Sequence, residues 1–465
     1  MKNIAFLSDW IIIIKRGGVM KKILPVLGCI FFLFVSASGN ILKGPYLSCL
    51  TTTSIRITYE TDDASDTRIR YSHGGVYRRS DTLSTEIYIP ESVTHHTLEI
   101  TGLSPGSRYF YRVLSGDSFS PVDSFLTAPT ESRFSFLVFG DNRTDSVSHQ
   151  AVVDAMMEEE GILFVINGGD LVAAGYSLSD WQTFFNIERD LIASYAYYPV
   201  LGNHEIPNNQ FINYFELPSN ERYFSWVIGN CKFIILNTNE SYLWGSSQRD
   251  WFESELAASG AYDYTFVVFH HPAYSSGNHG STVAVQLFLV PLMEDYAVDF
   301  VFNSHDHSYE HAYVNGIHYL VSGGGGAPLY SVGTSDWTIY SESVHHYIRF
   351  DIDGENIRFY AKRPDGSIMD SLVIGSFGIE ESALPEEISL SAYPNPFNSS
   401  VRISVSDKDV NVPIDVFNIR GERVVSLSLL DGEAIWAPDD LPAGVYFATI
   451  KIDGQNFIDK LVYLK

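Results

Sequence analysis

Short apolar runs that end abruptly in polar residues recur through the middle of the chain. They cover residues 136–139, 164–166, 198–201, 266–269 and 300–302. Runs of this length and composition are typical of strands buried on both faces of a sheet. The patterns between them predict helices over residues 148–160, 179–194, 248–258 and 283–295. Because strands alternate with helices, we expect an α/β layered domain over residues 132–376.

Shorter patterns, in which apolar and polar positions alternate, flank this region on both sides. On the N-terminal side they cover residues 53–60, 66–71, 96–100 and 109–114, with turn residues between them. This pattern predicts an antiparallel β-sandwich over residues 41–128. On the C-terminal side, a linker at residues 377–388 precedes more short strands. We therefore expect a second, smaller β-sandwich over residues 389–465.

The first 39 residues have the character of a leader. Met20-Lys21-Lys22 precede an apolar run from Ile23 to Val35, and small residues follow as far as Gly39. A positive start, a short apolar core and small residues are typical of a secretory signal peptide, with Met20 as the expected start. The core is too short to span a membrane comfortably. We therefore predict export and no transmembrane segment in the mature protein.

Composition and charge narrow the classes of partner. The chain has 465 residues, of which 45% are hydrophobic, and its formal net charge is -26. Such a strong negative charge argues against nucleic acid as a main partner, because phosphate backbones attract clustered Lys and Arg. Cys29, Cys49 and Cys231 fall in different predicted segments, so we expect neither a disulfide framework nor a cysteine metal cluster. We expect a monomer.

The polar residues that follow the apolar runs are types that bind metal ions. They are Asp141, Asp170, Asn203, His270, and the pair His305 and His307. In open α/β sheets the functional site lies outside the carboxyl ends of the strands, so these side chains are expected to meet. A mixed set of carboxylate, amide and imidazole suits a pair of divalent or trivalent ions such as iron, manganese or zinc. Two such ions can clamp a displacement at phosphorus.

The order of these motifs resembles a known family. The motifs of this chain stand in the same order as those of the calcineurin-like metallophosphoesterases. They are Gly-Asp, a second Gly-Asp, Gly-Asn-His-Glu, His-x-Pro and His-x-His. The resemblance is closest to the purple acid phosphatases, which also carry a fibronectin type III-like domain in front, opening with a segment like Gly44-Pro45-Tyr46. Leu103-Ser104-Pro105-Gly106 resembles a fibronectin turn. The resemblance covers residues 41–376 and implies a four-layer α/β sandwich for residues 132–376.

The resemblance also implies a role for each ligand. Asp141 and His307, with Asp170, would bind one ion at what we call the first metal site. Asn203, His270 and His305, again with Asp170, would bind another at the second metal site. Asp170 would then bridge the two ions.

Three residues outside the ligand set are candidates for contact with substrate. His204 takes the position of a histidine that contacts phosphate or donates a proton, and His279 resembles a second histidine on the substrate side. Arg143 is a candidate because a guanidinium matches phosphate oxygens. His271 is expected to support the ligands rather than to bind a metal ion. The loop Gly323–Pro328 either cradles a phosphate through its amides or makes a tight turn near the site.

Two departures from the family pattern concern the first metal site. Many relatives have Asp-x-His where this chain has Asp141-Asn142-Arg143. Purple acid phosphatases take a tyrosine ligand from Gly-Asp-x-x-Tyr, but Ala173 stands at that position and Tyr176 comes three residues too late. The first site is thus one protein ligand short. We expect it to bind its ion weakly and to lack the purple chromophore.

The C-terminal segment has motifs of its own. Tyr393-Pro394-Asn395-Pro396-Phe397 opens it, and Pro442-Ala443-Gly444-Val445-Tyr446 comes later. These resemble the type A sorting domain of the type IX secretion system. The resemblance implies type IX secretion machinery as a partner and a secreted or cell-surface protein of a Gram-negative bacterium. A plain adhesive β-sandwich is the alternative.

Together these patterns predict a secreted, metal-dependent phosphoric ester hydrolase. The resemblance implies an acid-phosphatase-like phosphomonoesterase that uses metal-bound hydroxide on a small phosphate ester. A phosphodiesterase or nucleotidase is one alternative, since the fold hosts both. A catalytically weak surface binding protein on a phosphatase scaffold is another, and the missing ligand of the first site favours it.

Overall fold

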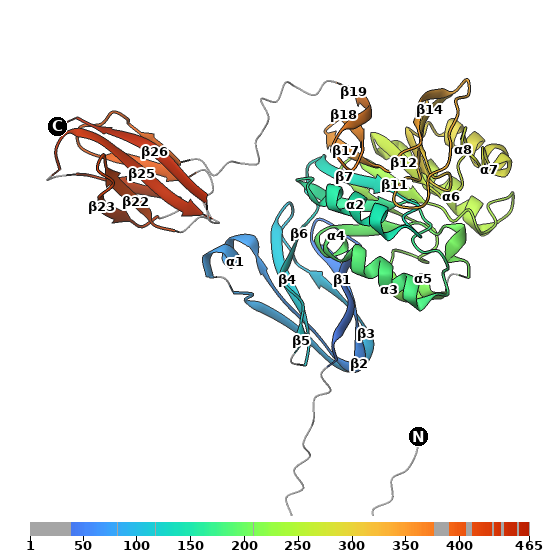
Figure 1. The fold of residues 1–465 in the computed structure, drawn as a ribbon, viewed down its shortest axis with the longest axis horizontal. Coiled ribbons are helices and arrows are strands. Elements are labelled where there is room, and N and C mark those ends of the chain that lie inside the picture. The colour runs from blue at the N-terminus through green and yellow to red at the C-terminus, as the bar shows by residue number, and fades with distance from the viewer. Residues whose placement is uncertain are drawn as a thin grey trace, which may run out of the picture. The chain divides into compact units, whose positions relative to one another are not determined.

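The computed structural model of the protein describes residues 39–80, 82–116, 118–207, 209–375, 390–405, 412–429, 432–438, 441–452 and 455–464 (Figure 1). The predicted leader and signal peptide up to residue 38, with Cys29, and the predicted linker 377–388 lie outside the described residues. Among the helices of the described residues, none is both long and apolar enough to cross a membrane.

The N-terminal domain consists mostly of sheet. Its elements are β1 (Ile41–Ser48), β2 (Ser54–His73), α1 (Gly74–Ser80), β3 (Thr85–Thr101), β4 (Arg108–Ser115), β5 (Ser118–Phe119) and β6 (Asp123–Leu126). The two runs predicted at 53–60 and 66–71 form one long strand, β2, which pairs with β3 along both halves and is irregular between Glu60 and Thr67. The first half of β2 also pairs with β1, and the second half with β4.

The N-terminal domain is joined to the following domain through its first strand. β1 pairs in parallel with β9 (Ala196–Pro199) at Leu47 and Ala196, so that one 12-stranded sheet runs through both domains. Two tyrosine hydroxyls strengthen the junction. Tyr46 donates to the Tyr214 carbonyl at 2.5 Å, and Tyr111 donates to the Ala193 carbonyl at 2.8 Å.

The α/β domain contains two sheets. The first is the remainder of the 12-stranded sheet, in the order β19 (Ile368–Ile374), β18 (Asn356–Lys362), β17 (Tyr347–Asp353), β7 (Arg133–Phe139), β8 (Ile162–Asn167) and β9. The second has the order β10 (Phe224–Ile228), β11 (Cys231–Ile235), β12 (Tyr264–Val268), β13 (Phe300–Asn303), β15 (Ile317–Ser322), β14 (Tyr309–Val314) and β16 (Thr338–Glu342). Strands β7, β8 and β9 are parallel, and so are β11, β12, β13 and β15.

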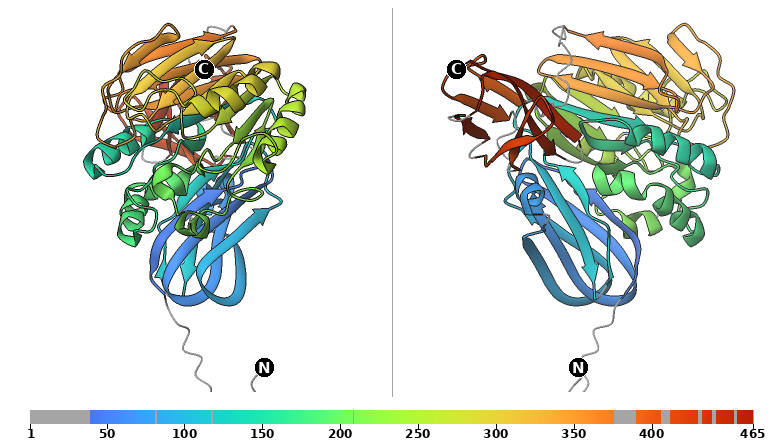
Figure 2. Two further views of the ribbon diagram at one scale, coloured as in Figure 1. Left: turned by 90° about the vertical axis from the view of Figure 1, so that its right-hand side faces the viewer. Right: turned by 60° about the vertical axis from the view of Figure 1, so that its left-hand side comes forward.

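The two sheets pack face to face between two groups of helices. Phe136 of β7 contacts Phe233, Phe266 and Phe302 of the second sheet, with ring centroids 5.3, 5.6 and 6.3 Å apart. Helices α2 (Ser146–Met157), α3 (Leu178–Ile187), α4 (Arg189–Ser194) and α5 (Asn209–Tyr214) pack on the first sheet. Helices α6 (Ser247–Ala257), α7 (Val283–Phe288) and α8 (Val290–Asp295) pack on the second (Figure 2). The expected four-layer sandwich is confirmed.

Two of the predicted helices are each divided in two. The helix predicted at 179–194 breaks at Glu188, which ends α3 and begins α4 and whose buried carboxylate lies 2.8 Å from His149 Nε2. The helix predicted at 283–295 breaks at Leu289, because Pro291 lacks an amide hydrogen and is tolerated only in a first turn. The other two form as α2 and α6, capped by Asp145 and Ser246. Short 3₁₀ helices occur at Asn203–Glu205 and Ser259–Ala261.

The C-terminal domain is a small pair of antiparallel sheets. One has β20 (Leu390–Tyr393), β21 (Val401–Val405) and β24 (Glu433–Trp436), and the other has β23 (Arg423–Leu427), β22 (Ile414–Asn418), β25 (Gly444–Ile452) and β26 (Gln455–Tyr463). Phe397, Trp436 and Tyr446 lie in the core of this domain. The predicted second β-sandwich is confirmed.

Candidate metal centre

The predicted ligands lie at the carboxyl ends of neighbouring parallel strands. Asp141 follows β7, Asp170 follows β8 and Asn203 follows β9 in the first sheet, and His270 follows β12 and His305 follows β13 in the second. Asp141, Asp170 and His305 adopt left-handed backbone conformations, with φ of 52°, 57° and 73°. Such values are uncommon outside glycine, and they cluster where backbone geometry serves a site. Each turn brings its side chain back over the end of the sheets.

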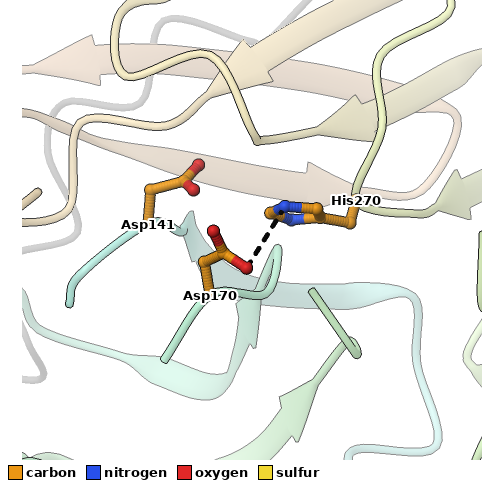
Figure 3. A group of neighbouring side chains, drawn as sticks. All are labelled: Asp141, Asp170 and His270. Atoms are coloured by element: carbon orange, nitrogen blue, oxygen red, sulfur yellow. Dashed lines mark ion pairs between the residues drawn. The ribbon is translucent and has the colours of Figure 1, made fainter. Parts of the chain in front are cut away.

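Asp141, Asp170 and His270 form the most compact group of potential ligands among the described residues (Figure 3). One ligand atom from each lies within 4.8 Å of the others, and all three residues are buried. His270 Nε2 is 3.4 Å from Asp170 Oδ1. Burial, and then the neighbouring Asp170 carboxylate, raise the pKa of Asp141 well above its usual value. Two buried carboxylates in one group need a cation between them to remain charged.

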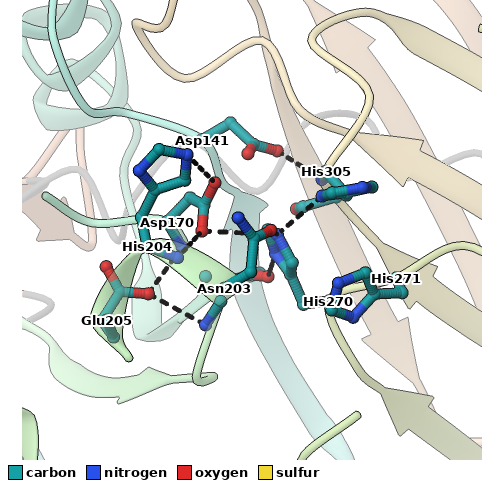
Figure 4. A network of polar contacts seen from close by, with 12 residues as sticks. Asp141, Asp170, Asn203, His204, Glu205, His270, His271 and His305 are labelled. Carbon is teal, nitrogen blue, oxygen red and sulfur yellow. Dashed lines mark hydrogen bonds and ion pairs between the residues drawn. The ribbon is translucent and has the colours of Figure 1, made fainter. Parts of the chain in front are cut away.

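The ring of His270 is oriented for metal binding. Its Nδ1 lies 2.9 Å from the Gly168 carbonyl, which can only accept, so this nitrogen carries the proton. Burial lowers the pKa of His270, so the ring is neutral and Nε2 presents a lone pair. That nitrogen faces Asn203 Oδ1 at 3.2 Å and His305 Nδ1 at 3.3 Å, besides Asp170 Oδ1 (Figure 4). Four ligand-type atoms thus converge with at most one N–H among them, which fits a bound cation.

Asp141 supplies a further free ligand atom. Its Oδ2 accepts the backbone N–H of His305 at 2.6 Å, which fixes the carboxylate against that turn. Its Oδ1 is buried and has no hydrogen-bond partner in the described part of the chain. A buried carboxylate oxygen without a donor is costly unless an ion takes that place. The contacts around His270 therefore fit an ion at the second metal site, whereas Asp141 Oδ1 lies toward the first, 3.6 Å from His307 Nε2.

The first metal site is occupied by a side chain. His307 Nδ1 lies 2.7 Å from the Pro328 carbonyl, so His307 Nε2 presents its lone pair, and Arg143 Nη2 donates to it at 3.3 Å. Arg143 Nε donates to Asp170 Oδ2 at 3.2 Å. The ring of Tyr330 stacks on His307 at 4.0 Å between centroids. Arg143 thus lies among the predicted ligands of the first site rather than in open solvent.

The two candidate substrate-side histidines lie around the same centre. His204 Nδ1 donates to the Ala173 carbonyl at 2.7 Å, and its Nε2 is 3.7 Å from Asp170 Oδ2. His279 is exposed, and its ring is 4.3 Å from that of His305. Tyr176 is 73% exposed. All of the predicted site residues are therefore gathered at one end of the two sheets.

Two buried carboxylates that the sequence analysis gave no role hold the loops of the centre. Glu205 accepts the backbone N–H groups of Gly202, Asp170 and Val172 at 2.9 to 3.2 Å, and burial, then Asp170, raise its pKa to about 8. Asp306 accepts the N–H groups of His279 and Gly280 and the hydroxyl of Ser275. Both residues lie inside recognised motifs, Glu205 in Gly-Asn-His-Glu and Asp306 in His-x-His, and these motifs were the sequence signal that could have identified them.

The glycine loop and His271 have supporting positions. The N–H of Gly325 donates to the Gly140 carbonyl, and the N–H of Ala327 donates to the Asp141 carbonyl at 2.7 Å. A Cβ on Gly323 would lie 2.7 Å from Asp141 Oδ2. The loop Gly323–Pro328 is therefore a tight turn against the first ligand, and these two amides are not free for phosphate. His271 Nδ1 pairs with Thr238 Oγ1 at 2.8 Å.

Family models match three parts of the chain. Residues 134–309 match the calcineurin-like phosphoesterase model, and residues 43–127 match the purple acid phosphatase N-terminal domain. Residues 391–464 match the secretion system C-terminal sorting domain. The predicted resemblances to these families are confirmed, whereas the signal peptide and the fibronectin type III resemblance remain predictions.

Individual proteins are similar over part of the chain. Purple acid phosphatase 15 of Arabidopsis thaliana is 26% identical over 51% of this chain and 53% of its own length. An uncharacterized protein of Mycobacterium tuberculosis, Rv2577, is 25% identical over 46% of this chain and 50% of its own length. The chain thus spans about half the length of these curated relatives.

Solved structures share the fold. A purple acid phosphatase from yellow lupin seeds superposes with a TM-score of 0.61 at 18% identity, over 73% of this chain and 75% of that one. PhoD superposes with a TM-score of 0.57 at 11% identity, over 74% and 94%. Residues 134–309, which hold the candidate ligands, are thus similar to the calcineurin-like phosphoesterases, the domain in front of them to the N-terminal domain of purple acid phosphatases, and the C-terminal domain to a secretion sorting domain.

Proposed function

We propose that the chain hydrolyses small phosphate monoesters with a metal ion held at the second metal site. The observation that supports this most directly is the convergence of Asp170, Asn203, His270 and His305 around one point with at most one N–H among the ligand atoms. A bound iron, manganese or zinc ion would activate water at neutral pH and would neutralise charge that develops on phosphate.

The residues around the ion have distinct roles in this proposal. Asp170, Asn203, His270 and His305 would hold it, with Asp141 on the side of the first site. His204 serves as the acid, because its Nδ1–H is engaged by the Ala173 carbonyl and the proton it can give is therefore on Nε2 of the imidazolium. That nitrogen lies 3.7 Å from Asp170 Oδ2, on the side of the centre. His279 is exposed beside His305 and orients the phosphate group.

A catalytically weak binding protein is the second candidate, and one observation favours it. Arg143 lies against Asp170 and His307, and Ala173 stands where a tyrosine ligand is expected, so the first site holds a cationic side chain and is one ligand short. The complete second site favours hydrolysis instead. An assay of the purified chain on an aryl phosphate monoester and on the matching diester distinguishes the candidates. Preferred release from the monoester supports the proposal, preferred release from the diester makes the chain a phosphodiesterase, and release from neither contradicts both activities.

We also propose that the chain is exported across both membranes of a Gram-negative bacterium. The match of residues 391–464 to the secretion sorting domain supports this, because that domain is read by type IX secretion machinery. The predicted signal peptide at residues 20–39 would supply the first crossing. Phosphate esters outside the cell would then be the substrates.

A further inference from the structure

Among the described residues, Arg143 is the side chain that brings a permanent positive charge into the predicted ligand set. Its guanidinium donates from Nε to Asp170 Oδ2 at 3.2 Å and from Nη2 to His307 Nε2 at 3.3 Å. The Arg143 side chain is only 14% exposed, and Asp170 is 1% exposed. A guanidinium keeps its charge under all ordinary conditions, so this is a fixed cation beside a buried carboxylate.

The contacts of Arg143 use the lone pairs that an ion at the first site would need. Pro328 fixes the His307 ring so that Nε2 is its only free acceptor, and Arg143 takes that acceptor. Asp170 Oδ2, the oxygen that turns away from His270, is taken by the same guanidinium. Tyr330 stacks on His307 and keeps the ring in this orientation. An ion at the first site would have to displace Arg143 from both partners.

The second site differs in this respect. His270 Nε2 faces Asn203 Oδ1, Asp170 Oδ1 and His305 Nδ1, and within the described part of the chain none of these contacts involves a Lys or Arg side chain. The unpartnered Oδ1 of Asp141 lies instead toward the first site, 3.6 Å from His307 Nε2. A guanidinium thus neutralises part of the negative charge at the first site, whereas no side-chain cation lies among the described contacts of the second site.

We propose that Arg143 takes the place of the first metal ion, so that the chain binds a single ion at the second site and uses the guanidinium as its second positive charge. Asp170 then joins the ion and Arg143 instead of bridging two ions. His307 serves to position Arg143 rather than to bind a metal. This inference rests on the metal centre of the proposed function, but it makes a separate statement about how many ions that centre holds.

The number of bound ions tests the inference without any measurement of activity. Purified full-length chain, stripped with a chelator and reloaded with Mn²⁺, should retain about one equivalent by elemental analysis, whereas a two-metal centre would retain about two. The variant Arg143→His removes the guanidinium and offers an imidazole nitrogen at the same place. The amount of Mn²⁺ that this variant binds should therefore rise to about two equivalents. Arg189→His is the matched control, because Arg189 also pairs with a carboxylate, Asp123 at 3.1 Å, away from the centre.

Spectroscopy of the same samples gives a second readout. The electron paramagnetic resonance spectrum of the Mn²⁺-loaded wild-type chain should be that of an isolated ion. The spectrum of Arg143→His should show magnetic coupling between two ions. If Arg143→His does not fold, Arg143→Gln serves instead, because it leaves Asp141, Asp170 and His307 free to bind a second ion.

Each outcome decides the question. Two equivalents of Mn²⁺ bound to the wild-type chain overturn the inference and leave the proposed hydrolysis intact. One equivalent of Mn²⁺ in both Arg143 variants has the same consequence. A wild-type chain that retains no Mn²⁺ removes the metal centre of the proposed function as well. One equivalent in the wild type and in Arg189→His, with two in an Arg143 variant, supports it.

Discussion

Gly202 shows how closely the ligand residues depend on their neighbours. A Cβ built at this position would lie 2.2 Å from Asp170 Oδ1 and 2.3 Å from the Asp170 backbone nitrogen. Both distances are far shorter than a van der Waals contact, and the second involves backbone that cannot turn aside. Only a residue without a side chain allows the loop after β9 to lie against the loop after β8.

We therefore predict that Gly202→Ala weakens metal binding. The added methyl group displaces Asp170, and disturbed support of a ligand costs about tenfold or more in metal affinity. Titration of the stripped protein with Mn²⁺ measures this. Gly260→Ala is the control, because a Cβ at Gly260 has nothing within 4 Å. Equal affinities in the two variants would contradict the prediction.

At the residue scale, the proximity of the candidate ligands could be predicted because each follows an apolar run. Asp141, Asp170 and His270 needed only the rule that strand ends share an edge of the sheet. Glu205 and Asp306 were not assigned roles, because they act through backbone N–H groups of loops that are distant in sequence. The contacts of Arg143 with Asp170 and His307 likewise depend on the path of two separate turns.

Within the N-terminal domain, His96 couples the stability of strand β3 to pH. The ring is fully buried, stacks on Tyr59 at 4.2 Å and contacts the hydroxyls of Thr61 and Thr67 at 3.0 and 2.8 Å. Burial, and then the neighbouring His95, lower the pKa of His96 from 6.5 to about 4. The folded state therefore favours the neutral ring.

This shift has a definite sign. Between pH 6.5 and about 4 the unfolded chain binds a proton at His96 that the folded chain does not, so the contribution to stability is complete above pH 6.5 and falls as the pH decreases. The slope approaches about 1.4 kcal/mol per pH unit in that window. Denaturant unfolding at pH 7 and pH 5 should show this loss in the wild-type chain and less of it in His96→Gln. His73→Gln, on strand β2, is the control, and an unchanged difference in His96→Gln would refute the assignment.

Element boundaries followed the sequence where a local signal existed. The caps Asp145 and Ser246 mark the starts of α2 and α6 within two residues of the prediction. The break between α3 and α4 was not predicted, because it depends on the burial of Glu188 against His149 of another helix. The single strand β2 was predicted as two, because its irregular middle interrupts the alternation.

At the scale of the whole molecule, three modules follow one another along the chain. Their fold classes were predictable from the change in hydrophobic period. The link between the first two domains was not predictable, because β1 joins β9 through one residue pair, Leu47 and Ala196, whose members lie far apart in the sequence. Tyr46 and Tyr111 add contacts to backbone carbonyls that no local pattern indicates.

The sorting domain leads to a prediction about export. In a bacterium with a type IX system, the full chain should appear outside the cell, and a chain that lacks residues 385–465 should remain in the periplasm, because the matched domain is what the outer-membrane step reads. Immunoblots of the cell fractions measure this. Asp170→Asn is the control for export without activity. Secretion of the truncated chain at the wild-type level would remove the claim.

The proposed metal-dependent hydrolysis depends most on the ligand set that surrounds His270. Its most direct test is phosphate release from an aryl phosphate by chelator-stripped chain as Mn²⁺ is added back, compared with Asp170→Asn and Asn203→Ala. The wild-type rate should rise from near zero in proportion to bound ion, and both variants should lose activity by about a hundredfold or more, since each removes a ligand of the ion. Full activity of the stripped wild-type chain, or of both variants with metal added, would contradict metal-dependent hydrolysis at this site.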